Sequence, residues 1–426
     1  MTNLDIRHRI EARISQGEFL ANMLLLVHKD SGNVQADFVE RLCSIATTVR
    51  ALLEGNGLLQ KILYQPSTYW PEQRGKSYAF VDGGVASVDL PSAGPIGIRV
   101  GSYLVRPGDE SDSRERFKIE LSLVDDLYSP NGALYDDDFL DLAKLRDAAR
   151  IVSELSAGLS LARQVDGDGP PDAVVLHGPL VNPVAPYGLD GFPPFGLGAC
   201  RQFVGDNDWH GDDRDRQFVS LYALLLEKLR ETGTPVVGAV ERSVGRDPIF
   251  IRTALDGLLK AREAETLLEQ IRSYGLNDAA LLDVVLVEGE YVTPLAVGRQ
   301  GARNKWPRFW EEKIGRYPKA LTTYLKPSAL VQPFRVEAFE DVRNLDSVLA
   351  LILHTSRLLP SYGFPVGLDI VDKFAKVPAW LSRGVKGQHQ VVLLKQALAS
   401  GDPRAVSFAK RVVAAKGRDW LFRPEA

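Results

Sequence analysis

Tyr78-Ala-Phe-Val-Asp-Gly-Gly84 is the stretch that decides the fold, a short apolar run that ends in an acid and two glycines. Aromatic and β-branched residues in such a run favour a buried strand, and the glycines allow another backbone or a phosphate to come close. Strand-like runs follow at 85–90, 96–105 and 117–124, separated by Pro, Gly and charged turns. The sequence therefore predicts a group of neighbouring strands around Asp82.

Beyond these strands, helical and strand-like patterns alternate. Residues 139–163 carry the apolar spacing of an amphipathic helix, and residues 172–177 form the next apolar strand. A helical run at 221–229 and an apolar strand at 235–241 come after them. A run of strands followed by alternating helices and strands predicts an α/β fold with a mixed sheet flanked by helices.

The amino-terminal segment has a different pattern. Apolar residues recur at helical spacing in two runs, from Ile10 to Leu26 and from Phe38 to Leu52, and breaks follow at Asn56-Gly57 and Gln65-Pro66. We expect residues 1–70 to form a helical hairpin arm that buries one face against the body or against a second copy of the chain. Residues 71–426 would form the main domain.

Composition excludes several classes of protein. The chain has 426 residues, 45% of them hydrophobic and 25% charged, which is typical of a globular protein and not of a disordered one. Two cysteines cannot build a disulfide framework or a thiolate zinc cluster, which favours a reducing compartment. No run approaches the roughly 20 apolar residues of a membrane-spanning helix. We expect a cytoplasmic protein with no membrane partner.

The net charge of −4 hides a strong segregation along the chain. Residues 109–141 hold eleven acids and three bases, whereas residues 299–326 hold eight bases and two acids. Residues 373–426 hold eleven bases and three acids. A uniformly basic coat for nucleic acid is excluded, but a basic carboxyl-terminal region is predicted.

Several acids and one histidine stand where chemistry is feasible. Asp82 and His177 each end a predicted strand before glycine, and Glu154 borders the apolar face of a helix. Asp372 opens a late helix, and Glu241 ends another strand. Oxygen and nitrogen ligands from separate elements that meet at one end of a sheet are what a hard divalent ion needs.

Each residue also has an ordinary structural explanation. Asp82-Gly83 is a common turn signal, and Glu154 has Arg150 one helical turn away as an ion-pair partner. A histidine at a strand end is more often structural than a ligand. At a helix start, the carboxylate of Asp372 would stabilise the helix dipole. The residues alone leave both interpretations open.

Ordered blocks of sequence resemble the NurA family of DNA-end-processing nucleases, whose core is ribonuclease H-like. The blocks span roughly residues 76–380 and are Phe80-Val-Asp-Gly-Gly84, Arg146 through Glu154, Val175-Leu-His-Gly-Pro-Leu180, Gly233 through Ser243, Phe334-Arg-Val-Glu337 and Gly363-Phe-Pro through Asp372-Lys373. The resemblance implies a ribonuclease H-like mixed sheet, with the helical arm before it and the basic region after it.

The resemblance also implies a function. It implies an Mn²⁺- or Mg²⁺-dependent deoxyribonuclease that works as a homodimer beneath a HerA-type hexameric translocase ATPase, in DNA repair or anti-phage defence. Asp82, Glu154 and Asp372 fall on positions that bind metal in the family. His177 stands where many members have aspartate, and Phe364 where many have tyrosine. We therefore expect Asp82, Glu154, His177 and Asp372 to be catalytic metal ligands, with Glu241 and Lys373 as additional members of the site.

The basic segment at 299–326 independently favours DNA binding. Lys and Arg neutralise phosphates and aromatic faces stack unpaired bases, and we expect a DNA path along Arg303, Lys305, Trp306, Arg308 and Trp310. The alternative is that the aromatics of this segment, which include Tyr317 and Tyr324, belong to the core. A second functional alternative is a non-catalytic adaptor that clamps DNA and docks on an ATPase ring. The sequence has no G-x-x-x-x-G-K-[ST] phosphate loop, so any motor is a partner's.

Overall fold

The computed structural model describes residues 18–87, 96–124, 142–163, 169–181, 203, 218–242, 247–297 and 315–414. Within these ranges the strands are β1 (Leu59–Lys61), β2 (Tyr78–Ser87), β3 (Ile96–Val105), β4 (Glu115–Val124), β5 (Ala173–His177), β6 (Val236–Val240), β7 (Glu290–Val292), β8 (Ala320–Leu325) and β9 (Phe334–Phe339). The helices are α2 (Glu18–Gly55), α3 (Pro66–Glu72), α4 (Leu142–Ala162), α6 (Phe218–Glu231), α7 (Ile249–Leu258), α8 (Ala261–Ser273), α9 (Asp278–Val285), α11 (Leu345–Arg357), α12 (Val366–Ala375), α13 (Ala379–Ala399) and α14 (Pro403–Ala414).

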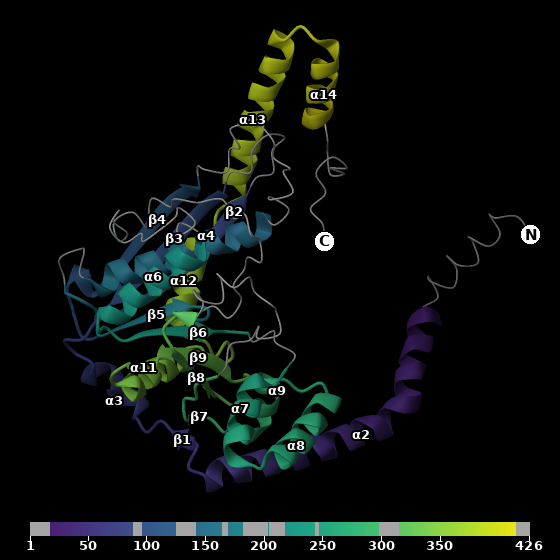
Figure 1. The fold of residues 1–426 in the computed structure, drawn as a ribbon, viewed down its shortest axis with the longest axis vertical. Helices are drawn as coiled ribbons and strands as arrows, with labels where there is room; N and C mark the ends of the chain where they lie inside the picture. Colours follow the sequence, from purple (N-terminus) through teal and green to yellow (C-terminus); the bar gives the residue numbers. More distant parts are fainter. Residues whose placement is uncertain are drawn as a thin grey trace, which may run out of the picture.

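The described strands form one nine-stranded sheet in the order β1-β7-β8-β9-β6-β5-β2-β3-β4 (Figure 1). Strands β2, β3 and β4 form an antiparallel meander, and β5 and β6 add to β2 in parallel. Strand β9 then runs antiparallel to β6. The sheet is therefore mixed, and the predicted α/β class with a mixed sheet flanked by helices is confirmed.

Two layers of helices cover the central strands. Helices α4 and α6 pack on one face, where Val81, Leu176 and Val236 lie in the core. Helices α11 and α12 pack on the other face, against Phe80 and Val175. Because β5 and β6 are covered on both sides, they are continuous apolar runs without alternation. The carboxyl ends of β5 and β6 therefore point to one edge, where the candidate residues gather.

Strand β2 excludes a turn at Asp82-Gly83, which was one of the two interpretations that the sequence left open. The strand continues through the two glycines to Ser87, with Asp82 opposite Gly101 and Gly84 opposite Arg99 on β3. The predicted separate strand at 85–90 is thus the second half of β2, as far as the structure describes it. The glycines serve close packing: a Cβ on Gly84 would lie 2.0 Å from the carbonyl oxygen of Ala375, at the end of α12.

Helix α2 corrects the prediction of an amino-terminal hairpin. A single helix runs from Glu18 to Gly55, and its carboxyl-terminal part buries Ile45, Val49 and Leu53 against α7, α8 and α9. The amino-terminal part of α2 extends away from the body (Figure 1). Helices α13 and α14 form a hairpin that projects from the opposite end. None of the described helices combines the length and the apolar character needed to cross a bilayer.

Candidate active site

Asp82 and His177 form the centre of the site. Asp82 lies in the middle of β2, and its side chain is 6% exposed; His177 is the last residue of the parallel neighbour β5. The Asp82 Oδ2 atom lies 2.8 Å from His177 Nδ1, and Oδ1 accepts a hydrogen bond of 2.7 Å from the Gly83 amide. Because Oδ2 is a carboxylate acceptor, Nδ1 is the protonated nitrogen of the ring and Nε2 is left to face other partners.

The pKa of His177 is set by two opposing effects. Burial disfavours the imidazolium, but the hydrogen bond to Asp82 and the negative charge of that carboxylate outweigh burial and raise the pKa. The more distant carboxylates of Glu154 and Glu241 act in the same direction. His177 is therefore held as a hydrogen-bond donor toward Asp82 at neutral pH.

Glu154 approaches the site from below the sheet. It projects from α4, which packs on β2, and a Cβ on Gly83 would lie 2.6 Å from its Oε1 atom. Arg150, one turn earlier, donates a hydrogen bond of 2.7 Å to the same oxygen. Burial, aided by the charge of Asp82, raises the pKa of Glu154 to about 7 although Arg150 opposes the shift. The positive charge of Arg150 thus does not fully offset the cost of ionising this buried carboxyl group.

The predicted residues on α12 lie in a different environment. The prediction that Asp372 opens the helix is wrong, because α12 begins at Val366 and Asp372 lies in its last turn. The side chain of Asp372 is 34% exposed and accepts a bond of 2.5 Å from Lys376 Nζ, and Lys373 is 67% exposed and pairs with Asp369 at 2.5 Å. Helix α12 packs on β2 and β3, and the charge of Asp82 contributes to the raised pKa of Lys376. Asp372 and Lys373 therefore border the Asp82 site as solvent-exposed ion pairs.

Glu241 lies just beyond β6, near enough for its charge to act on His177. Its carboxylate has Arg242 Nε at 3.8 Å. The structure thus pairs Asp82 with His177 and places Glu154 beside Gly83, and the charges of Glu154 and Glu241 both act on His177.

Two aromatic residues adjoin the site: Phe364 packs beside the His177 ring, and Tyr362 packs against Phe364. Phe364 is 2% exposed, and its ring centroid lies 5.4 Å from that of His177. Tyr362 stands edge-on to Phe364 at 6.2 Å. Burial and the charges of Glu241, Asp369, Asp372 and Asp82 raise the pKa of Tyr362 to about 12, so its phenol is a hydroxyl beside the acids. Sequence reasoning missed Tyr362, because a tyrosine before Gly-Phe-Pro carries no signal of its own.

The donor chemistry of the site fits a hard divalent ion. Two carboxylates and one imidazole are ligands that Mn²⁺ accepts, and a cation beside Glu154 would offset the charge that burial disfavours. Among the described residues, no three His, Cys, Asp or Glu side chains are gathered closely enough to form a metal cluster. The donors stand instead in two pairs, Asp82 with His177 and Glu154 with Arg150.

The predicted DNA path lies outside the described residues, since Arg303, Lys305, Trp306, Arg308 and Trp310 all fall within 298–314. Two aromatics of the same basic segment are described. Tyr317 packs against Tyr222 and Tyr324 against Phe250, and both are at least 95% buried. For these two tyrosines the core alternative is confirmed.

A NurA domain model matches residues 76–377, which is more than half of the chain. The chain belongs to the NurA family of nucleases. The match contains Asp82, Glu154, His177 and Asp372 and agrees with the ordered blocks of the sequence. A comparison with curated proteins gives no match.

A solved NurA structure shares the fold. The NurA nuclease from Sulfolobus solfataricus aligns with a TM-score of 0.51 at 13% identity, over 90% of this chain and 98% of that chain. A NurA structure with manganese aligns with a TM-score of 0.41 at 12% identity, over 88% and 97%. A NurA structure bound to dAMP and manganese gives 0.36 at 16% identity, over 85% and 94%.

Proposed function

We propose that this NurA-family protein is an Mn²⁺- or Mg²⁺-dependent deoxyribonuclease that hydrolyses phosphodiester bonds at DNA ends. The observation that carries the proposal is the buried contact of Asp82 with His177, with Glu154 directly beneath it at Gly83. A buried glutamate and a histidine that both have a raised pKa, near the carboxyl end of a strand, are typical of a catalytic site.

Asp82, Glu154, His177 and Asp372 would hold the metal. When bound, Mn²⁺ or Mg²⁺ supplies Lewis acidity toward the phosphate and lowers the pKa of a bound water. Within the protein, Asp82 holds the Nδ1 proton of His177, which leaves Nε2 as the free ring nitrogen to bind or accept a proton. Glu154 contributes a buried carboxylate, and its hydrogen bond from Arg150 keeps that side chain in place. No residue need form a covalent bond to DNA.

DNA would reach this site along the basic segment 299–326, with a net charge of +6 from eight bases and two acids. Arg303, Lys305 and Arg308 would contact phosphates, and Trp306 and Trp310 would stack on bases. Tyr362 lies edge-on to Phe364 and offers a hydroxyl where Phe364 has none.

The partners follow from the family and from what the chain lacks. Because the sequence contains no phosphate loop, a HerA-type hexameric ATPase would supply translocation, in DNA repair or defence. A homodimer would form through the arm within residues 1–70, where Phe38 and Val39 of α2 are exposed. The compartment would be the cytoplasm.

A non-catalytic DNA-clamping adaptor is the second candidate. The ion pair of Asp372 with Lys376 favours it, since a lysine competes with a cation for that carboxylate. Metal binding separates the candidates: an adaptor binds no Mn²⁺ at Asp82.

The test is a cleavage assay on end-labelled linear DNA and closed circular DNA, with Mn²⁺, Mg²⁺ or EDTA, and with and without a co-encoded ATPase. The nuclease proposal expects metal-dependent loss of the end label from linear DNA and no cleavage in EDTA. Binding of DNA without cleavage under every metal and ATPase condition would overturn it in favour of the adaptor.

A further inference from the structure

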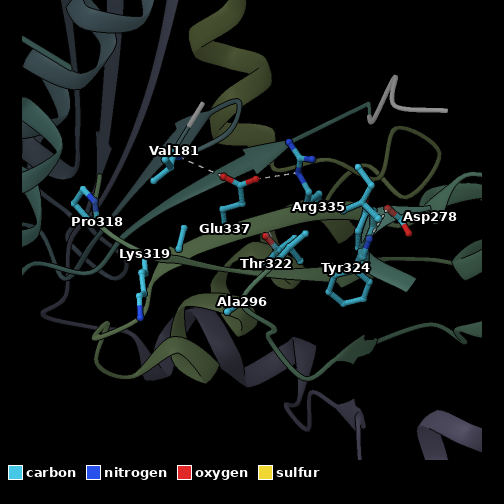
Figure 2. Close-up of a pocket in the computed structure, with 13 residues that line it drawn as sticks. Val181, Asp278, Ala296, Pro318, Lys319, Thr322, Tyr324, Arg335 and Glu337 are labelled. Carbon is cyan, nitrogen blue, oxygen red and sulfur yellow. Dashed lines mark hydrogen bonds and ion pairs between the residues drawn. The ribbon is translucent and has the colours of Figure 1, made fainter. Parts of the chain in front are cut away.

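The loop that follows His177 is fastened from three sides. Gly178 has a positive φ of 105° and donates a hydrogen bond of 2.7 Å to the carbonyl of Ala239 on β6. The Tyr222 hydroxyl on α6 donates to the carbonyl of Leu180 at 3.3 Å. On the third side, Glu337 Oε2 on β9 accepts from the amide of Val181 at 3.4 Å (Figure 2).

The loop can reach Glu337 only because β6 has a glycine there. Gly238 stands opposite Glu337 in the sheet. A Cβ at position 238 would lie 2.3 Å from the amide nitrogen of Leu180 and 2.6 Å from the carbonyl oxygen of Gly178. The chain after His177 therefore folds back directly over β6, and the Glu337 carboxylate on β9 accepts the hydrogen bond of the Val181 amide.

Glu337 is costly to bury, which argues that its contact has a purpose. Its side chain is 8% exposed, and burial raises its pKa although Arg335 and the amides of Val181 and Leu180 oppose the shift. Arg335 Nε lies 3.1 Å from Glu337 Oε1. Arg335 and Glu337 are two residues apart on β9, so both side chains lie on the same face of the sheet, as Figure 2 shows.

We propose that Glu337, held by Arg335, is a positioning residue that sets the imidazole of His177 against Asp82. Only Gly178, Pro179 and Leu180 separate His177 from the amide that Glu337 holds, so a shift of that loop is transmitted directly to the ring. Removing a residue that orients a metal ligand without touching the metal typically changes metal affinity or activity by about 10- to 100-fold. The inference rests on the proposed function in so far as His177 serves a metal.

A cavity of about 250 Å³ beside Glu337 makes the substitution practical. Arg335, Glu337, Thr322 and Asp278 are among the residues that line it, as Figure 2 shows. If Glu337 is removed, water entering this cavity can solvate the guanidinium of Arg335, which also lines it, so the fold is expected to survive. Glu340, exposed just beyond the end of the same strand, provides the matched control.

The test compares the wild type with Glu337→Ala, Glu337→Gln and Glu340→Ala by two measurements. The first is the downfield NMR resonance of the His177 Nδ1 proton in metal-free protein, assigned by its loss in His177→Gln. The second is the Mn²⁺ dissociation constant from electron paramagnetic resonance. We expect Glu337→Ala to lose the proton resonance and to weaken Mn²⁺ binding by about 10- to 100-fold.

The conservative variant is expected to rescue. Glu337→Gln keeps an oxygen that accepts from Val181, so the resonance should remain, and Glu340→Ala should match the wild type. Retention of the resonance and of Mn²⁺ affinity in folded Glu337→Ala would overturn the inference. If that variant does not fold, Tyr222→Phe loosens the same loop from α6, and an unchanged resonance there would overturn it instead. A wild type that binds no Mn²⁺ would sink the nuclease proposal, while the proton resonance would still decide the positioning role.

Discussion

The two walls of the candidate site differ in how deeply their charged side chains are buried. On the wall made by β2, β5 and α4, Asp82 and Glu154 are almost fully buried and are held by short contacts to His177 and Arg150. On the wall made by α12, Asp372 is partly exposed and paired one turn on with a lysine. Desolvation makes a buried carboxylate sensitive to any cation, whereas an exposed pair is screened by water. If the site is catalytic as proposed, we therefore expect the buried wall to contribute more to catalysis than the exposed one.

The largest effect is expected at Asp82. Asp82→Ala removes both the proposed metal ligand and the acceptor that fixes His177, so cleavage should fall by about 1000-fold or more, or about 4 kcal/mol of transition-state stabilisation. Folding and DNA affinity should stay near the wild type. Rates of end-label release in Mn²⁺, together with a thermal melt, measure this. Cleavage by Asp82→Ala at the wild-type rate would refute the assignment of the buried wall.

Glu154 gives the second largest effect, and it is seen in stability as a function of pH. Because the folded pKa of about 7 lies above the usual glutamate value of 4.5, the protonated form is the one that folding favours. The associated stability is present below the unfolded pKa and is lost as pH rises through about 7, on the order of 2–3 kcal/mol.

Metal-free wild type should therefore lose stability between pH 5.5 and pH 8, and Glu154→Gln should lose clearly less. Denaturant unfolding at these two pH values checks the difference in slope. Added Mn²⁺ should restore stability to the wild type at pH 8, because it binds the folded state. Equal slopes in the two proteins would show that Glu154 does not carry the shift.

A smaller effect is expected on the exposed wall at Asp372. Asp372→Ala removes a proposed ligand that already has Lys376 as a partner, so cleavage should fall by about 10- to 100-fold, less than for Asp82→Ala. The measurement is kcat and KM at saturating Mn²⁺. A loss as large as that of Asp82→Ala would show that the two walls contribute equally and would break the comparison.

The smallest effect is expected at Lys373. Its side chain is 67% exposed and its partner Asp369 lies on the same helix face, so Lys373→Ala should change kcat by no more than about twofold. Lys376→Ala provides the contrast, because it frees Asp372 and should tighten Mn²⁺ binding. If Lys373→Ala abolishes cleavage, then α12 supplies a catalytic cation, and the exposed wall contributes more to cleavage than this comparison predicts.

The sequence predicted the parts of the fold that depend on local pattern. The apolar runs that became β5 and β6, and the amphipathic run that became α4, lie where their periods indicated. The sequence pattern ends strand β2 at Gly83, because glycine after an acid is a local turn signal. The two glycines have a different cause that is distant in the sequence: Glu154 and Ala375 occupy the space that side chains at these positions would need. The break expected between the two runs of α2 likewise does not occur.

In the site, too, the residues that depend on local pattern could be predicted and the contacts between distant segments could not. Asp82, Glu154 and His177 could be found, because each follows an apolar run or borders an apolar helix face and matches a family block. Their pairing could not, because it depends on the register of β2 with β5. Glu337 and Tyr362 were not assigned to the site, since contacts across more than 100 residues, such as that of Glu337 with Val181, leave no local trace.

The most direct measurement is a crystal structure of the protein soaked in Mn²⁺, with anomalous scattering recorded at the manganese edge. The account predicts an anomalous peak in contact with Asp82 and near Glu154, and its loss in Asp82→Ala crystals. A peak bound only at the Asp369 and Asp372 carboxylates of α12, or the same Asp82-site peak in crystals of the variant, would contradict it.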